Sequence, residues 1–316
     1  MIAWIVGALG AFAVLVLAAW WWVYAPRPCE PALAARVVHG EVVVDGRERT
    51  YTAVVPDRHL LDAPMVLVFH GAGSDGAMMR IFTGYRFDEL AVERGFVAIY
   101  PDGYQGTWND CRLMSAYPAR TENIDDEEFV AAIVAASATT LGTSMERVFA
   151  AGLSNGGHFA LRLATGRPDL VRRVAAFAAA YPAPENNGCT FSGAPVATMF
   201  ALGTADRINP FRGGMAGAFG RKLGTVLSAR DSAAVIAERN GITAAPVREP
   251  FTNSAATGIT DTTRVTYPDD TAPVILFEVH GGGHVVPNPA YRMPRFLGAT
   301  SRHLDGPLAA VDFFLG

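Results

Sequence analysis

Residues 148–157 read Val-Phe-Ala-Ala-Gly-Leu-Ser-Asn-Gly-Gly, and this stretch decides the fold of the chain. The apolar run 148–151 is typical of a buried strand, and residues 158–164 follow with an amphipathic helical pattern. Between them lies a G-x-S-x-G pentapeptide, a sharp turn that projects its serine hydroxyl away from the backbone. The pentapeptide alone also occurs by chance as an ordinary glycine-rich turn. The flanking strand and helix favour Ser154 as a nucleophile.

Outward from this motif, apolar runs bounded by Gly, Pro or Asp alternate with helical stretches. Continuous Val, Ile, Leu, Phe and Ala runs are typical of strands covered on both faces of a sheet. The predicted strands are residues 65–69, 96–100, 147–151, 173–179, 196–202 and 274–279, and the predicted helices are 125–141, 156–165 and 308–314. This alternation predicts an α/β fold with a mostly parallel sheet.

Three further segments are expected outside this alternating pattern. Residues 36–55 predict an antiparallel hairpin around the turn Asp45-Gly46, at an edge of the sheet. The Gly- and Ala-rich stretch 211–225 and the Thr-rich stretch 252–267 are expected to leave the sheet as excursions above it. Each of the two is either a cover for substrate or a plain surface loop.

A serine hydroxyl becomes a good nucleophile when a base takes its proton and a carboxylate orients that base. In this architecture the acid and then the histidine follow the serine along the chain. Asp206 comes directly after a predicted strand, where open α/β sheets place functional groups, and is the expected carboxylate. His284 lies at the far end of the glycine-rich loop after the last predicted strand and is the expected base. Less well placed candidates are His158, His280 and His303 for the base, and Asp231, Asp261, Asp269 and Asp270 for the acid.

An oxyanion on the attacked carbonyl needs N–H donors held in position. Asn155, the residue after the nucleophile, is expected to offer its backbone N–H. The second donor is expected from the loop His70-Gly71-Ala72-Gly73-Ser74 after the first buried strand, where the backbone of Ala72 is the candidate. Gly71 and Gly73 are also possible sources of this second donor.

Trp108 and His70 are candidates for contact with substrate. A tryptophan near the site lines a pocket or packs in the core, and both roles are open for Trp108. For His70 we favour a hydrogen-bonding role that shapes the loop.

Composition excludes several other classes of function. The chain has 316 residues with 26 Lys and Arg against 30 Asp and Glu, a net charge of −4, which does not suit nucleic acid binding. No H-E-x-x-H motif or phosphate-binding loop is present, so neither a metal nor a cofactor is expected. Three cysteines show no C-x-x-C spacing, and Cys111 with Cys189 is the pair most suited to a bridge, unless all three thiols are unpaired.

The first 24 residues contain no charged side chain and, as a helix of ~1.5 Å per residue, are long enough to cross a bilayer. A membrane anchor is favoured over a cleavable signal peptide, because no positive side chain precedes the apolar stretch. Trp20, Trp21, Trp22 and Tyr24 fit an interfacial aromatic belt. Arg27 and Arg36 after the span would place the body in the cytoplasm by the positive-inside rule.

The ordered motifs of the chain resemble those of a family of secreted esterases. They are His70-Gly71, Tyr100-Pro101-Asp102-Gly103, Thr107-Trp108-Asn109, Asp125-Asp126 with Phe129, residues 152–157, Gly203-Thr204-Ala205-Asp206 and Gly282-Gly283-His284. Over residues 36–316 the chain is similar to polyhydroxybutyrate depolymerases, feruloyl esterases and acetylxylan esterases.

This resemblance implies an α/β-hydrolase fold, the triad Ser154, Asp206 and His284, ester substrates, no cofactor, and export from the cytoplasm. The chain departs from the family at Val286, where members often have Trp, and at Ile242, where a Cys is common.

The sequence therefore predicts a serine hydrolase of carboxylic esters, either small or polymeric, with an N-terminal segment 1–24, a linker 25–35 and a catalytic domain 36–316. We expect helices on both faces of its sheet. Following the export that the resemblance implies rather than the positive-inside rule, we expect a location outside the cytoplasm, anchored or secreted. The competing hypotheses are peptidase or acyltransferase activity with the same triad, and an inactive binding module.

Overall fold

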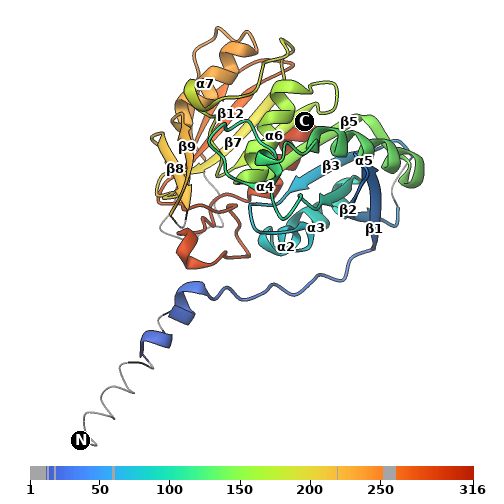
Figure 1. The fold of residues 1–316 in the computed structure, drawn as a ribbon, viewed down its shortest axis with the longest axis horizontal. Helices are drawn as coiled ribbons and strands as arrows, with labels where there is room; N and C mark the ends of the chain where they lie inside the picture. The colour runs from blue at the N-terminus through green and yellow to red at the C-terminus, as the bar shows by residue number, and fades with distance from the viewer. Residues whose placement is uncertain (1–11, 13, 18, 59–60, 219, 252–260) are drawn as a thin grey trace, which may run out of the picture.

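A ten-stranded sheet forms the centre of the protein in the computed structural model, which describes residues 12, 14–17, 19–58, 61–218, 220–251 and 261–316 (Figure 1). Its strands stand in the order β1-β2-β4-β3-β5-β6-β7-β12-β11-β10. Their bounds are β1 Ala35–Val44, β2 Arg47–Pro56, β3 Ala63–Phe69, β4 Val97–Pro101, β5 Thr143–Leu153, β6 Arg173–Phe177, β7 Ala197–Gly203, β10 Val247–Phe251, β11 Thr262–Tyr267 and β12 Val274–Val279.

The inner strands from β4 to β12 pair in parallel, and two antiparallel strands extend the sheet at each edge. Every residue of β3, β4, β7 and β12 is buried, as expected for strands covered on both faces. The mostly parallel α/β sheet is therefore confirmed. The predicted hairpin is also confirmed, since β1 and β2 pair around Asp45 and Gly46.

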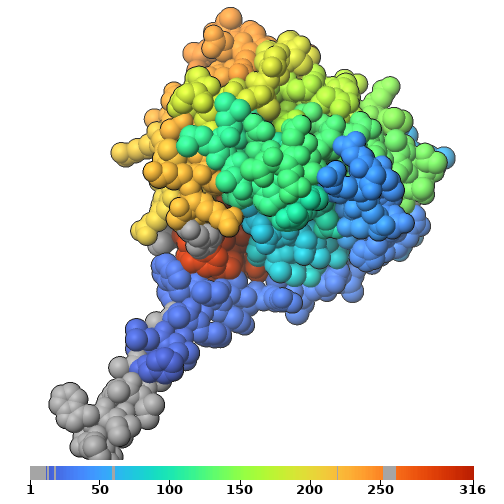
Figure 2. All heavy atoms as spheres, viewed as in Figure 1, coloured from blue at the N-terminus to red at the C-terminus, as the bar shows by residue number. Residues whose placement is uncertain are grey.

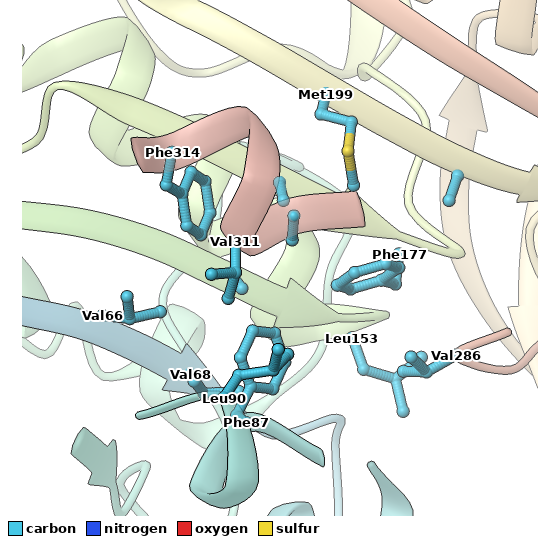
Figure 3. Close-up of a cluster of buried hydrophobic side chains, with 14 of the residues drawn as sticks. Val66, Val68, Phe87, Leu90, Leu153, Phe177, Met199, Val286, Val311 and Phe314 are labelled. Carbon is cyan, nitrogen blue, oxygen red and sulfur yellow. The ribbon is translucent and has the colours of Figure 1, made fainter. Parts of the chain in front are cut away.

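Helices cover both faces of the sheet. Successive residues of β3 point to opposite faces, so Val66 and Val68 enter one core, and Leu67 and Phe69 enter another. The first core also contains residues of α2 Gly76–Phe82, α3 Arg86–Arg94 and α8 Gly306–Leu315, as Figure 3 shows for α3 and α8. Helices α5 Asp126–Leu141, α6 Asn155–Gly166 and α7 Ala229–Arg239 pack on the other face. The remaining helical elements are short: α4 is Pro118–Thr121, and two 3-10 turns are Pro184–Asn186 and Arg295–Leu297.

Helix α5 forms where the sequence predicts it, because both of its ends are well capped. The Asp125 carboxylate accepts a 2.9 Å hydrogen bond from Glu128 N, and three acidic residues occupy the first turn. At the other end Gly142 takes the left-handed conformation with φ 68°, which ends the helix.

Two stretches expected to leave the sheet behave differently. Residues 211–225 contain most of a separate hairpin, β8 Gly214–Ala218 with β9 Arg221–Val226, so that excursion is confirmed. Residues 262–267, by contrast, form β11 inside the central sheet, and that part of the expectation is wrong. The β-branched Thr and Val side chains of this strand suit an antiparallel partner for β12. Residues 252–260 lie outside the described part of the chain.

The N-terminal region was predicted to be a hydrophobic helix followed by a linker. Residues 1–11, 13 and 18 of the predicted segment lie outside the described residues. Within the described part of the chain, no helix combines the length and hydrophobicity that a bilayer span requires. Residues 24–33 have no regular secondary structure, and Glu30 pairs with Arg80 at 2.6 Å where this stretch meets the body (Figure 2).

Candidate active site

Ser154 stands at the turn between β5 and α6 in a conformation that L-residues rarely adopt. Its φ is 55° and its ψ is −118°, so the turn is strained and the side chain projects from it. The turn requires glycine on both sides: a Cβ on Gly152 would lie 2.2 Å from the carbonyl oxygen of Gly156, and a Cβ on Gly156 would lie 2.5 Å from the carbonyl oxygen of His70. The pentapeptide therefore has the geometry expected of a nucleophile turn.

Asp206 and His284 meet at the carboxyl ends of the neighbouring strands β7 and β12. The Nδ1 atom of His284 lies 2.7 Å from Oδ2 of Asp206, and both side chains are buried. The other carboxylate oxygen, Oδ1, accepts hydrogen bonds from the backbone N–H groups of Ile208 and Asn209. With Nδ1 engaged by the carboxylate, Nε2 is the ring nitrogen of His284 that has no partner among the described residues.

The loops that carry these two residues are tied to each other. The N–H of Thr204 donates to the carbonyl of Val279, and the N–H of Ala205 donates to the carbonyl of Gly282, both at 2.9 Å. The backbones approach so closely that a Cβ on Gly203 would lie 2.2 Å from the Gly282 oxygen. Two residues 78 positions apart are thereby held together by backbone contacts as well as by their own hydrogen bond.

Ser154 and His284 line one pocket of about 650 Å³. Ala72 also lines this pocket, beside the turn that carries Ser154. Its remaining walls come from residues 71–74, residue 82, residues 105–118, residue 208, the β8–β9 hairpin, and the loop 284–297. Lining side chains from these segments include Phe82, Gln105, Thr107, Tyr117, Ile208, Arg221, Leu223, Met293 and Leu297.

The loop after β3 presents backbone N–H groups next to Ser154. A Cβ on Gly71 would lie 3.6 Å from the Ser154 Cβ, so the two segments are in contact. Gly73 N already donates to Gly106 O at 2.8 Å, which removes it as an oxyanion donor. Among the described residues, neither the Ala72 N–H nor the Asn155 N–H has an acceptor, and Asn155 belongs to the first turn of α6, where N–H groups lack partners within the helix.

The predicted substrate contacts of Trp108 and His70 need correction, because both side chains are fully buried and neither lines the pocket. Trp108 stacks on Phe159 and donates from Nε1 to the His70 carbonyl at 2.9 Å. His70 bonds from Nδ1 to the Gly71 carbonyl, and its Nε2 accepts from Gly103 N. Burial lowers the pKa of His70, so the ring is neutral and fixes the shape of the loop.

Comparison with known proteins identifies the family of this chain. The family model described as "Dienelactone hydrolase family" matches residues 51–214, more than half of the chain, and this range includes Ser154 and Asp206. The chain belongs to the dienelactone hydrolase family.

Two relatives and one solved structure bear on the enzyme class and the fold of this family member. "Putative esterase NocK" of Nocardia uniformis subsp. tsuyamanensis is 31% identical over 93% of this chain and 87% of its own length. Feruloyl esterase D of Neurospora crassa is 27% identical over 79% of this chain and 78% of its own. The acetyl xylan esterase from Aspergillus awamori superimposes with a TM-score of 0.55 at 16% identity, covering 79% of this chain and 95% of that one, which shows the shared α/β-hydrolase fold. The predicted resemblance and the predicted enzyme class, a carboxylic ester hydrolase, are confirmed.

The sequence did not reveal how this family member holds its serine turn in place. The buried Asn155 side chain pairs with the backbone of Trp108, accepting from its N–H at 2.8 Å and donating to its carbonyl at 3.0 Å. It also donates to Oδ2 of Asp110 at 2.7 Å. Asp110 in turn forms a buried ion pair with Arg112 at 2.6 Å. Burial favours the neutral acid, but Arg112 outweighs it and lowers the pKa of Asp110.

His158 lies one helical turn after Ser154 and belongs to the same buried region. Burial, reinforced by the charge of Arg112, holds the pKa of His158 well below its usual range, so the ring is neutral. Its backbone N–H donates to the Ser154 carbonyl at 2.8 Å. No sequence pattern predicts the complete burial of the His158 side chain, because that burial depends on which loops pack against α6.

The remaining histidine and aspartate candidates lie outside the pocket. His280 bonds through Nε2 to the Thr263 hydroxyl at 2.9 Å. The Asp231 carboxylate accepts from the hydroxyl of Ser228, the cap of α7, and the Asp269 carboxylate accepts from Ala272 N. Cys111 and Cys189 form a disulfide, and Cys29 is a free exposed thiol. Within the described ranges, no group of three or more His, Cys, Asp or Glu side chains is placed to hold a metal ion.

Proposed function

We propose that this member of the dienelactone hydrolase family hydrolyses carboxylic esters through Ser154, His284 and Asp206. The observation that carries the proposal is the 2.7 Å bond between His284 Nδ1 and Asp206 Oδ2 beside a pocket that Ser154 also lines. A serine on a strained turn, an oriented imidazole and a shared pocket are the parts that acyl transfer requires.

In the proposed mechanism His284 Nε2 takes the proton of the Ser154 hydroxyl as its oxygen attacks the ester carbonyl. The N–H groups of Ala72 and Asn155 stabilise the oxyanion that forms. The C–O bond to the alcohol then breaks, and His284 returns the proton to the departing oxygen. Water, deprotonated by the same imidazole, attacks the acyl-enzyme and releases the acid.

Asp206 supports this cycle without exchanging a proton itself. Its Oδ1 is engaged by two backbone N–H groups, so the carboxylate cannot rotate, and Oδ2 stays directed at the imidazole. This arrangement keeps the productive tautomer of His284 and stabilises the imidazolium that forms during attack.

The proposed catalytic domain spans residues 36–316, preceded by a linker 25–35 and an N-terminal segment 1–24. We place the domain outside the cytoplasm, as an anchored or secreted enzyme. The Cys111–Cys189 disulfide supports this location, because such bridges persist in oxidising compartments. The relative named feruloyl esterase D supports an ester substrate, either small or polymeric. Val286, however, is buried in the core and offers no aromatic wall for a ring.

Labelling with a fluorophosphonate tests the nucleophile. We expect the wild type to be labelled and to hydrolyse 4-nitrophenyl acetate, and Ser154→Ala to lose both. Ser192→Ala is the control, since Ser192 is exposed and does not line the pocket. A folded wild type that is not labelled would favour an inactive binding module, and faster turnover of amides or of non-water acceptors would favour a peptidase or an acyltransferase.

A further inference from the structure

Arg221 is the one side chain with a permanent charge in the described lining of the pocket. That lining contains no Asp, Glu or Lys, and His284 is its other titratable base. Arg221 begins strand β9 of the β8–β9 hairpin. Arg112, which lies near the site, is paired with Asp110. Among the described residues, the side chain of Arg221 has no carboxylate within 4.0 Å and no hydrogen-bond partner.

The position of Arg221 relative to the site follows from the pocket lining. Both Arg221 and Leu223 of strand β9 line the pocket, and the pairing of β8 with β9 is irregular at Leu223. Lys222 lies between them and does not line the pocket, although Arg221 and Lys222 are both exposed. Arg221 is therefore part of the pocket wall, and its charged neighbour is not.

The two ends of the pocket differ in chemical character. Phe82, Met293 and Leu297 belong to the apolar cluster between the sheet and helices α2, α3 and α8. Tyr117 and Leu223 belong instead to the small cluster beneath the hairpin. Burial raises the pKa of Tyr117, and the charges of Arg112 and Arg221 both oppose that rise. The wall at the hairpin is thus the one that carries a positive charge.

We propose that Arg221 selects ester substrates that carry a carboxylate, with the Tyr117 hydroxyl as its neighbouring donor. This inference rests on the proposed function and names the substrate class for the same pocket. Arg221 is exposed as well as part of the pocket lining. Its unpaired guanidinium gains a charge-assisted hydrogen bond when a carboxylate enters the pocket, whereas a neutral group offers no comparable partner. Ser154 would attack an ester whose acyl or alcohol part ends in that carboxylate.

Two pairs of esters separate the acyl side from the alcohol side. The acyl pair is the 4-nitrophenyl monoester of adipic acid and the corresponding primary amide, which has the same shape without the charge. The alcohol pair is 4-acetoxybenzoate and 4-acetoxybenzamide. Within each pair the ratio of kcat/KM for the anionic to the neutral ester measures selection for the carboxylate, and intrinsic reactivity cancels when enzyme variants are compared.

We expect the ratio of at least one pair to fall about three- to ten-fold in Arg221→Gln and further in Arg221→Glu, with turnover of the neutral ester little changed. Lys222→Gln removes a charge from the next residue and should change the ratio less than about two-fold. Raising the salt concentration should lower the ratio of the wild type and not that of Arg221→Gln.

The inference is overturned if Arg221→Gln lowers kcat/KM equally for the anionic and neutral esters of both pairs, or if Lys222→Gln has the same effect on the ratio. These outcomes leave hydrolysis of the neutral esters by the wild type intact and so do not touch the proposed function. Failure of the folded wild type to hydrolyse any of the four esters would instead count against the proposed function, and the inference would fall with it.

Discussion

Replacing Asn155 with alanine would remove the three hydrogen bonds that hold the serine turn to the loop at Trp108 and Asp110. The side chain is completely buried, with bonds of 2.8, 3.0 and 2.7 Å. Two neutral bonds contribute about 1 kcal/mol each, and the bond to the Asp110 carboxylate contributes about 1.5–3 kcal/mol. We therefore expect Asn155→Ala to lower the free energy of unfolding by about 4 kcal/mol, a large part of the ~5–15 kcal/mol typical of a domain.

Asn155→Asp is a sharper version of the same test. It conserves the shape and the acceptor for Trp108 N–H, but it places a second carboxylate against Oδ2 of Asp110. Two carboxylates at this distance share one proton, which raises a pKa of the pair in the folded protein. A carboxyl group whose pKa is higher in the folded than in the unfolded protein stabilises the fold at low pH, and this stabilisation is lost as the pH rises through the folded-state pKa. The loss of unfolding free energy in Asn155→Asp relative to wild type should therefore be larger at pH 8 than at pH 5.

Urea unfolding at the two pH values measures both effects, and hydrolysis of a neutral 4-nitrophenyl ester measures the consequence for the site. We expect kcat of Asn155→Ala to fall at least about ten-fold, because the adjacent N–H is displaced from the oxyanion. Asn240→Ala is the matched control. The side chain of Asn240 also makes three hydrogen bonds, all of them to backbone groups and of 2.9 to 3.2 Å, and it lies outside the pocket. It should lose stability and keep its kcat.

The reasoning is refuted if Asn155→Ala loses less than about 1 kcal/mol, since three buried groups would then have found other partners. It is also refuted if the difference between Asn155→Asp and wild type does not change with pH. Equal losses of kcat in the Asn155→Ala and Asn240→Ala variants would show that general destabilisation, and not the displaced turn, lowers activity.

The same contacts predict three more measurable effects. Asp206→Asn should lower kcat by about 10³–10⁴-fold with little change in KM, because the base is then held in the wrong tautomer; steady-state kinetics checks this. Since burial lowers the pKa values of His70 and His158 below 6.5, the unfolded chain takes up protons that the folded chain does not. The free energy of unfolding should therefore fall as pH drops below about 6.5, by up to about 1.4 kcal/mol per pH unit for each ring, and His158→Phe should reduce that slope in urea titrations. The double variant Cys111→Ser, Cys189→Ser opens a loop of 78 residues and should lose about 4 kcal/mol in denaturant titrations.

Each of these predictions has a result that contradicts it. Wild-type kcat in Asp206→Asn would remove this carboxylate from the mechanism. A stability curve that stays flat from pH 7 to pH 5, or an unchanged slope in His158→Phe, would show that the buried rings are protonated in the folded state. A double cysteine variant as stable as wild type would show that the bridge does not constrain the unfolded chain.

Local patterns were enough to predict all strands of the central sheet except β10 and β11. Continuous apolar runs are long, bounded by Gly, Pro or Asp, and differ from amphipathic helices in their period, so β3 to β7 and β12 could be located within a few residues. The short helices α2, α3 and α7 were not singled out, because each buries only a few side chains. The sequence does not predict strand β11, because this Thr-rich segment becomes a strand through its pairing with β12.

By itself the sequence determined the order of the parts: the strained turn at Ser154, an acid after one strand and a histidine after another, since these depend on residues adjacent in the chain. Only the tertiary structure decided what surrounds them. The burial of Trp108 and His70, the hold of Asp110 on Asn155, and the approach of Arg221 to the pocket each join segments tens of residues apart. Such contacts depend on how helices and loops pack over the sheet, and packing leaves no periodic pattern in a single sequence.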